Sequence, residues 1–162
     1  MRYTAIWILS CALAWQNQIF AANTSATSRD NCPESTKATL QVFLTDVISW
    51  LNTLQSKQST GKLEEVKRYF TPTMEIYHNG QLVASGYLGF YKSQMLARRF
   101  VTQAVTHLPL QDVLLDQHKA AFHTTTTLTK KNHPPEEHEV IAIVEFADCK
   151  IVRWREVSKK IR

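Results

Sequence analysis

Apolar residues recur at helical spacing in three segments of the first hundred residues. Over residues 34–56, the repeat consists of Leu40, Leu44, Val47, Leu51 and Leu54. A shorter helix is expected from about residue 63, with Val66 and Phe70 on its inner face and Thr71-Pro72 ending it. A third helix is expected over residues 87–99, where Leu88, Tyr91 and Met95 share one face.

Strand patterns occupy most of the remaining sequence. Asn79-Gly80 divides residues 74–84 into a hairpin, since this dipeptide favours the two positive φ angles of a type I′ turn. Residues 102–116 are predicted to form a strand interrupted near Pro109, at an edge or a bulge. Residues 119–131 alternate between two faces, and residues 140–146 and 150–157 are expected to pair around Asp148-Cys149.

The order of these elements predicts the fold class. Helices that precede a mostly antiparallel sheet indicate an α+β domain. The strand from Val140 to Phe146 is apolar on both faces, and the helices can cover only one of them. A second subunit could cover the other face, which favours a homodimer through the sheet. The alternative is a central strand whose isoleucines face solvent.

The N-terminal segment predicts export. Arg2 precedes the apolar run Ala5–Trp15, and the small residues Ala21 and Ala22 follow, as in a secretory signal peptide. We therefore expect a signal peptide at residues 1–21, a flexible leader at 22–33, one domain at 34–158 and a basic tail at 159–162. The protein would then be secreted or periplasmic, with no stable membrane span after cleavage. An uncleaved anchor is the alternative.

Charge, cysteine content and residue spacing limit which partners, covalent links and cofactors can be expected. The formal net charge is +5, but the basic residues are scattered and form no stripe with aromatics, so nucleic acid is not an expected partner. Cleavage would leave two cysteines, Cys32 and Cys149, which could form one disulfide in an oxidising compartment or remain as thiols. No histidine or carboxylate spacing matches a closed metal site, and we expect neither a metal nor another cofactor.

Several short motifs, taken in order, resemble the SnoaL-like, nuclear transport factor 2-like superfamily. They are the amphipathic first helix, the stretch Leu63–Pro72, Asn79-Gly80, Gly86 and the ending Asp148–Trp154. The resemblance covers about residues 40–157. It implies a cone-shaped fold in which three N-terminal helices pack on a curved sheet. The family typically has Gly where Cys149 stands, so either the turn type differs or a disulfide holds that residue at positive φ.

The same resemblance bears on catalysis. Enzymes of this superfamily use an acid–base carboxylate inside the cone, and many members place an Asp near the end of the first strand. Tyr77-His78 occupies that place here. No catalytic carboxylate can therefore be transferred to this chain by position.

Three residues are candidates for acid–base chemistry. His78 adjoins the Asn-Gly turn and could act as a general base, although a histidine beside a turn is more often solvated. His118 is in phase with Ala120 and Phe122, which would point it into the cavity. Glu145 lies in an apolar strand, where burial would raise its pKa; the alternative is pairing with Arg153 or Arg155.

Four aromatic residues are candidates for ligand contact: Trp50, Tyr77, Tyr91 and Phe122. Aromatic residues at helical spacing are more often part of the packed core, and for Tyr77 the alternative is a cross-strand contact that packs the sheet. Three functions remain open at this point. They are binding of a small apolar molecule in the cone, isomerase, cyclase or dehydratase chemistry by His or Glu, and protein interaction through the sheet.

Overall fold

A computed structural model of the chain describes residues 37–54 and 62–162. Its helices are α1 (Lys37–Leu54), α2 (Leu63–Tyr69) and α3 (Gly86–Ala97). Its strands are β1 (Phe70–His78), β2 (Gln81–Ser85), β3 (Val101–Thr106), β4 (Gln111–Leu115), β5 (Lys119–Lys130), β6 (Glu136–Ala147) and β7 (Lys150–Lys160). The predicted signal peptide and leader lie outside the described residues.

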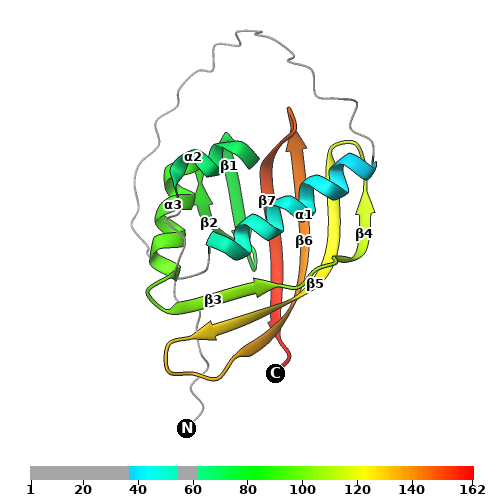
Figure 1. Ribbon diagram of the computed structural model, residues 1–162. Helices are drawn as coiled ribbons and strands as arrows, with labels where there is room; N and C mark the ends of the chain where they lie inside the picture. The colour runs from blue at the N-terminus through cyan, green and yellow to red at the C-terminus, as the bar shows by residue number, and fades with distance from the viewer. Residues whose placement is uncertain (1–36, 55–61) are drawn as a thin grey trace.

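The strands form one seven-stranded sheet in the order β2-β1-β7-β6-β5-β3, with β4 also paired to β5. Every pairing is antiparallel except that of β1 with β7, which is parallel. The sheet curls, and α1 crosses its hollow side (Figure 1). This arrangement confirms the predicted α+β cone, with helices ahead of a curved, mostly antiparallel sheet.

Alternation along the strands determines which side chains enter the cone. In β6 the buried residues are His138, Val140, Ala142, Val144 and Phe146, while the residues between them face outward. Phe70, Leu44, Ile48, Met74 and Ile151 are the largest side chains that are almost fully buried. They come from α1, β1 and β7 and pack in one core between helix and sheet, and burying each contributes roughly 1.5–3 kcal/mol.

Two tight turns carry the positive φ angles that the hairpins require. Asn79 and Gly80 have φ of 48° and 80°, as the sequence predicted for this turn. Asp148 and Cys149 have φ of 50° and 57° between β6 and β7. Cys149 is disulfide-bonded. Its pairing with Cys32 remains a prediction, because Cys32 lies outside the described residues.

Three strand boundaries differ from those expected. Strand β1 begins at Phe70, and the register shift between Phe70 and Glu75 accommodates Pro72, which has no N–H to donate. Strand β6 begins at Glu136 rather than Val140. Strand β7 continues to Lys160, so part of the predicted basic tail is paired sheet. Within the described residues, no helix is long and apolar enough to span a membrane.

Candidate functional site

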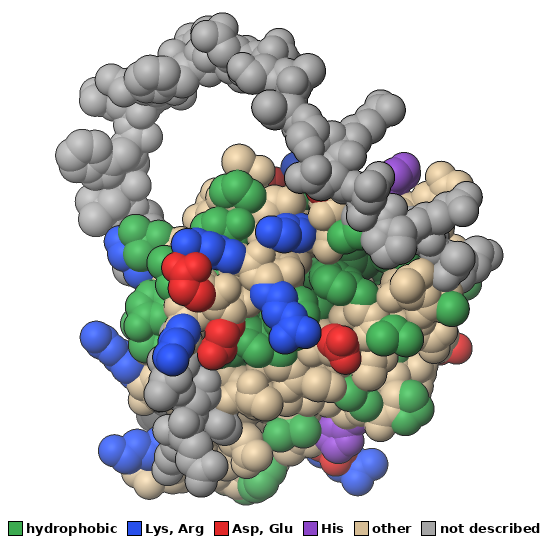
Figure 2. All heavy atoms as spheres, turned by 45° about the horizontal axis from the view of Figure 1, so that its top comes forward, with side chains coloured by type: hydrophobic (Ala, Val, Ile, Leu, Met, Phe, Trp, Pro, Cys, Tyr) green, Lys and Arg blue, Asp and Glu red, His purple; other side chains and the backbone are tan. Residues whose placement is uncertain are grey.

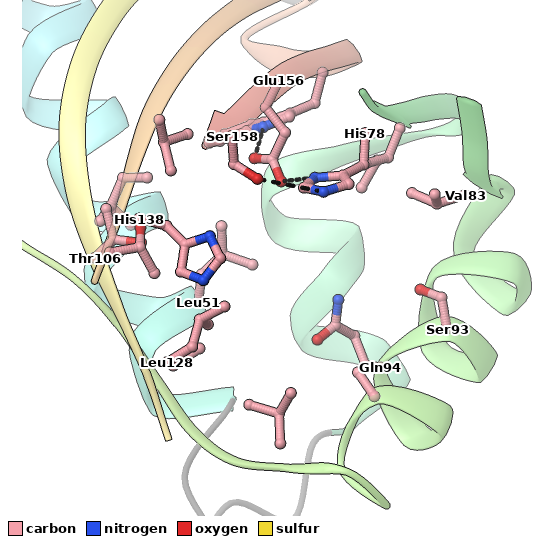
Figure 3. Close-up of a pocket in the computed structure, with 18 of the residues that line it drawn as sticks. Leu51, His78, Val83, Ser93, Gln94, Thr106, Leu128, His138, Glu156 and Ser158 are labelled. Carbon is pink, nitrogen blue, oxygen red and sulfur yellow. Dashed lines mark hydrogen bonds and ion pairs between the residues drawn. The ribbon is translucent and has the colours of Figure 1, made fainter. Parts of the chain in front are cut away.

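A cavity of about 500 Å³ lies between the helices and the hollow face of the sheet. Apolar side chains cover most of its wall, among them Leu51, Phe90, Phe122, Leu128 and Val140. Figure 3 shows polar side chains entering it from two sides, with His78, Glu156 and Ser158 together on one wall and His138 on another. The cone is therefore hollow rather than filled by its own core.

The polar end of the cavity follows from strand phase. On β1 the side chains that point inward are Met74, Ile76 and His78. The first two are apolar and the third, next to the hairpin turn, is polar. On β7, Glu156 and Ser158 continue the phase of Trp154. Parallel pairing of β1 and β7 puts His78 beside Glu156. Two polar strand ends thus meet at one edge of an apolar cavity.

His78 and Glu156 form a hydrogen-bonded pair there. His78 Nδ1 lies 3.0 Å from Glu156 Oε1, and the two side chains are 28% and 30% exposed. The backbone N–H of Asn79 donates to the Glu156 carbonyl at 2.8 Å, which ties the tip of the β1–β2 hairpin to β7. The backbone therefore holds the pair together independently of its side chains.

The neighbouring Asn79 fixes the tautomer of His78. The Ser158 backbone N–H, which can only donate, lies 2.9 Å from Asn79 Oδ1. The amide nitrogen Nδ2 of Asn79 is consequently the atom that faces His78 Nε2, at 3.1 Å. Because Nδ2 is a donor, Nε2 accepts and Nδ1 carries the proton. Neutral His78 thus donates from Nδ1 to Glu156.

Glu156 is an acceptor on both of its oxygens. Trp154 Nε1–H, which has no accepting capacity, donates to Oε2 at 2.8 Å, and His78 occupies Oε1. Both oxygens of Glu156 therefore accept hydrogen bonds at the edge of the cavity.

His138 enters the cavity from β6, and its side chain is only 6% exposed. Its Nε2 lies 3.5 Å from Glu136 Oε2. Hydrogen bonds from Lys130 and Lys160 lower the pKa of Glu136 to about 2. A carboxylate that is ionised at neutral pH thus lies beside this second cavity histidine.

Three of the four predicted ligand-contact residues lie apart from this cavity. Trp50 packs in the aromatic core, 4.9 Å from the Tyr69 ring centroid, and its Nε1–H donates to Glu65. Tyr77 is on the convex face, where its hydroxyl donates to Glu75. Tyr91 lines a separate hollow of about 10 Å³ beside α2. Phe122 lines the main cavity, in edge contact with Trp154.

Of the three acid–base candidates, the structure brings His78 to the cavity. His118 does not line the cavity as predicted, because it precedes β5 and is exposed in the turn, where its carbonyl accepts the Phe146 N–H. Glu145 faces the convex side and pairs with Arg153 at 3.3 Å and Arg155 at 2.8 Å. This is the ion-pair alternative that the sequence left open for Glu145.

Sequence reasoning missed Glu156, Ser158 and the inward position of His138. The available signal for Glu156 and Ser158 was their period-two spacing from Trp154. His138 follows closely on Pro134-Pro135, which suggests a loop, whereas β6 begins two residues before it. Among the described residues, no cluster of three or more His, Cys, Asp or Glu side chains could hold a metal ion.

Comparison with solved structures places this chain in a known fold. A SnoaL-like polyketide cyclase from Agrobacterium tumefaciens superposes with a TM-score of 0.59 at 16% identity, over 75% of this chain and 92% of that one. PrhC from Penicillium brasilianum superposes with a TM-score of 0.62 at 14% identity, over 77% of this chain and 83% of PrhC. AclR from Streptomyces galilaeus superposes with a TM-score of 0.59 at 13% identity, over 78% of this chain and 82% of AclR. No family model and no curated protein matches the sequence.

These likenesses establish the SnoaL-like, nuclear transport factor 2-like fold that the sequence resemblance predicted. At such identities the similarity concerns the backbone arrangement. The chemistry of this chain has to be inferred from its own cavity.

Proposed function

We propose that this protein is exported and binds a small, largely apolar molecule inside its cone. The observation that supports this most strongly is the cavity itself, about 500 Å³ in volume, with a mainly apolar surface and polar side chains that enter from two sides. Binding pockets for small molecules have this size and composition. A module that acted only through its outer surface would not need a hollow interior. The apolar run after Arg2 supports export.

Native mass spectrometry of the protein recovered from the medium or periplasm tests both parts. The expected result is a chain shortened by the signal peptide and carrying a co-purified small molecule. An apolar compound library should also raise the melting temperature, because a ligand that binds only the folded state stabilises it. Repeated absence of any bound molecule, with no thermal shift, would contradict the binding proposal.

A cavity-filling variant makes this test specific. Ala97 lines the cavity from α3, and Ala147 is exposed at the end of β6. Ala97→Phe should abolish ligand retention because the new ring occupies the cavity. Ala147→Phe is the matched control and should retain it. Equal retention in both variants would place the ligand elsewhere on the protein.

Acid–base catalysis is the second candidate, and the His78–Glu156 pair favours it. In the tautomer described above, His78 Nε2 is an acceptor that could take a proton from carbon next to a carbonyl, once the ligand displaces Asn79. Glu156 would then stabilise the imidazolium. Such chemistry predicts deuterium incorporation into carbonyl compounds incubated with the protein in heavy water, and its loss in His78→Gln.

A further inference from the structure

We infer that the polar end of the cavity selects ligands by head group, accepting hydrogen-bond donors that are neutral or cationic and rejecting anions. This inference rests on the proposed function, because it names the ligand class of the same cavity. It depends on the charges and the hydrogen-bond directions around Glu156.

The charge of the cavity wall is opposite to that of the whole chain. The protein has 19 Lys and Arg against 14 Asp and Glu, a net charge of +5. Among the described residues that line the cavity, none is Lys or Arg, and Glu156 is the only carboxylate. On the face shown in Figure 2, the basic side chains lie on the outside among acidic and apolar ones. A ligand entering the cone therefore leaves a positive exterior and meets a negative charge.

Hydrogen-bond direction strengthens this preference. The donors of Trp154 and His78 are both committed to Glu156, and Asn79 Nδ2 is committed to His78. The Thr124 hydroxyl donates to the His107 carbonyl at 2.9 Å. Glu156 has roughly four acceptor sites, and His78 and Trp154 occupy two of them. The strongest group left for a ligand is therefore an acceptor.

An anionic head group would gain little at this wall and lose its hydration. It would lie beside the Glu156 carboxylate in an apolar surrounding, where like charges repel strongly and no lysine or arginine compensates. A hydroxyl or ammonium group would instead donate to Glu156. The expected ligand class is an apolar body with an alcohol, phenol or amine at one end.

The experiment compares three probes that share one apolar body: naphthylmethanol, naphthylmethylamine and naphthylacetate, each titrated calorimetrically into the purified protein at neutral pH. The alcohol and the amine should bind with dissociation constants about tenfold or more below that of the carboxylate. The net positive charge of the protein favours the carboxylate nonspecifically, so it works against this expectation.

Two variants localise the effect. Glu156→Gln removes the charge while keeping the side-chain size, and it should reduce the preference for the amine to within about threefold of the carboxylate. Glu139→Gln, a matched change on the convex face where Glu139 lies 3.2 Å from His123, should leave the order of affinities unchanged.

The possible outcomes separate the two proposals. If the carboxylate binds as tightly as the alcohol and the amine, or more tightly, the head-group inference is overturned while cavity binding stands. If no probe binds and no compound in the apolar library does, the proposed function fails and the inference falls with it. Should Glu156→Gln not fold, the order of affinities in the unmodified protein still decides the matter.

Discussion

The side-chain amide of Asn52 pairs with both backbone groups of Thr106. Asn52 Nδ2 donates to the Thr106 carbonyl at 2.9 Å, and Asn52 Oδ1 accepts from the Thr106 N–H at 2.8 Å. Strand β3 is the last strand of the sheet path, so this pairing satisfies backbone groups at its edge. It also joins α1 to the rim of the cavity, because Asn52 and Thr106 both line it.

Replacing Asn52 by Ala should therefore loosen the helix that closes the cone. The change leaves a half-buried N–H and carbonyl of Thr106 without their partner, at a cost of about 1–3 kcal/mol in unfolding free energy. Urea unfolding measures this cost. Gln41→Ala, on the exposed side of α1, is the control and should change stability by less than about 0.5 kcal/mol. Equal effects of the two changes would show that the pairing of Asn52 with Thr106 does not stabilise the fold.

The tautomer of His78 is open to direct measurement. We expect its neutral ring to carry the proton on Nδ1, because Asn79 donates to Nε2 and Glu156 accepts from Nδ1. Two-bond nitrogen–proton couplings distinguish the two tautomers in solution. Asn79→Ala removes the donor that imposes this choice and should admit the other tautomer. A dominant Nε2–H form in the unmodified protein would refute the hydrogen-bond chain.

The contrast between His78 and Glu156 shows how far the sequence could lead. His78 adjoins an Asn-Gly turn, a local signal that can be read from its neighbours in the chain. Glu156 follows Arg155 near the end of a strand, where a charged side chain is typical of a solvent-facing position. The pair spans 78 positions and depends on a parallel pairing of β1 with β7, which the local pattern did not indicate.

The fold itself was more accessible, for a physical reason. Burial of one face of β5 follows directly from alternation, and Ala120, Phe122 and Thr124 are buried as their phase predicts. Strand ends are less constrained, because a polar residue can occupy either a loop or a strand rim. His138 lies in such a region, and only its cross-strand pairing places it in the sheet.

Glu136 predicts a specific response to acid. Lys130 Nζ lies 2.6 Å and Lys160 Nζ 3.0 Å from its two oxygens, and these bonds lower its pKa from 4.5 to about 2. A carboxyl with a depressed folded-state pKa stabilises the protein above its unfolded-state pKa. That contribution is lost as the pH falls from about 4.5 toward 2.

Replacing Glu136 by Gln should therefore lower the free energy of unfolding at neutral pH. In acid the variant and the unmodified protein should differ less, because Glu136 is then protonated. Because Lys160 is 54% exposed and water screens it, we expect about 1–2 kcal/mol rather than the full value of the shift. Unfolding measured between neutral pH and about pH 2 should show the two curves converging. Glu64→Gln, in an exposed pair with Lys67, is the control and should shift stability little at any pH. Parallel curves would refute this account.

The convex face of the sheet carries an apolar patch formed by Leu114, Ile141, Ile143 and Val157. These residues adjoin through cross-strand pairing: Ile141 faces Val157, and both Leu114 and Ile143 are partners of Ala121. Charged residues surround the patch, including Glu145 with its two arginines. An apolar centre with a charged rim is typical of a protein interface. We therefore propose the homodimer through this face.

Ile141→Lys tests the dimer, since it places a charge at the centre of the patch. Light scattering should give a dimer for the unmodified protein at micromolar concentration and a monomer for the variant. Leu82→Lys is matched closely, because Leu82 on β2 and Ile141 are both 52% exposed, and it should remain dimeric. Neither change should lower the stability of the single subunit, since both side chains are already half in solvent. A monomeric unmodified protein would rule out this interface. If the Ile141→Lys variant is still a dimer, the dimer interface lies on another surface.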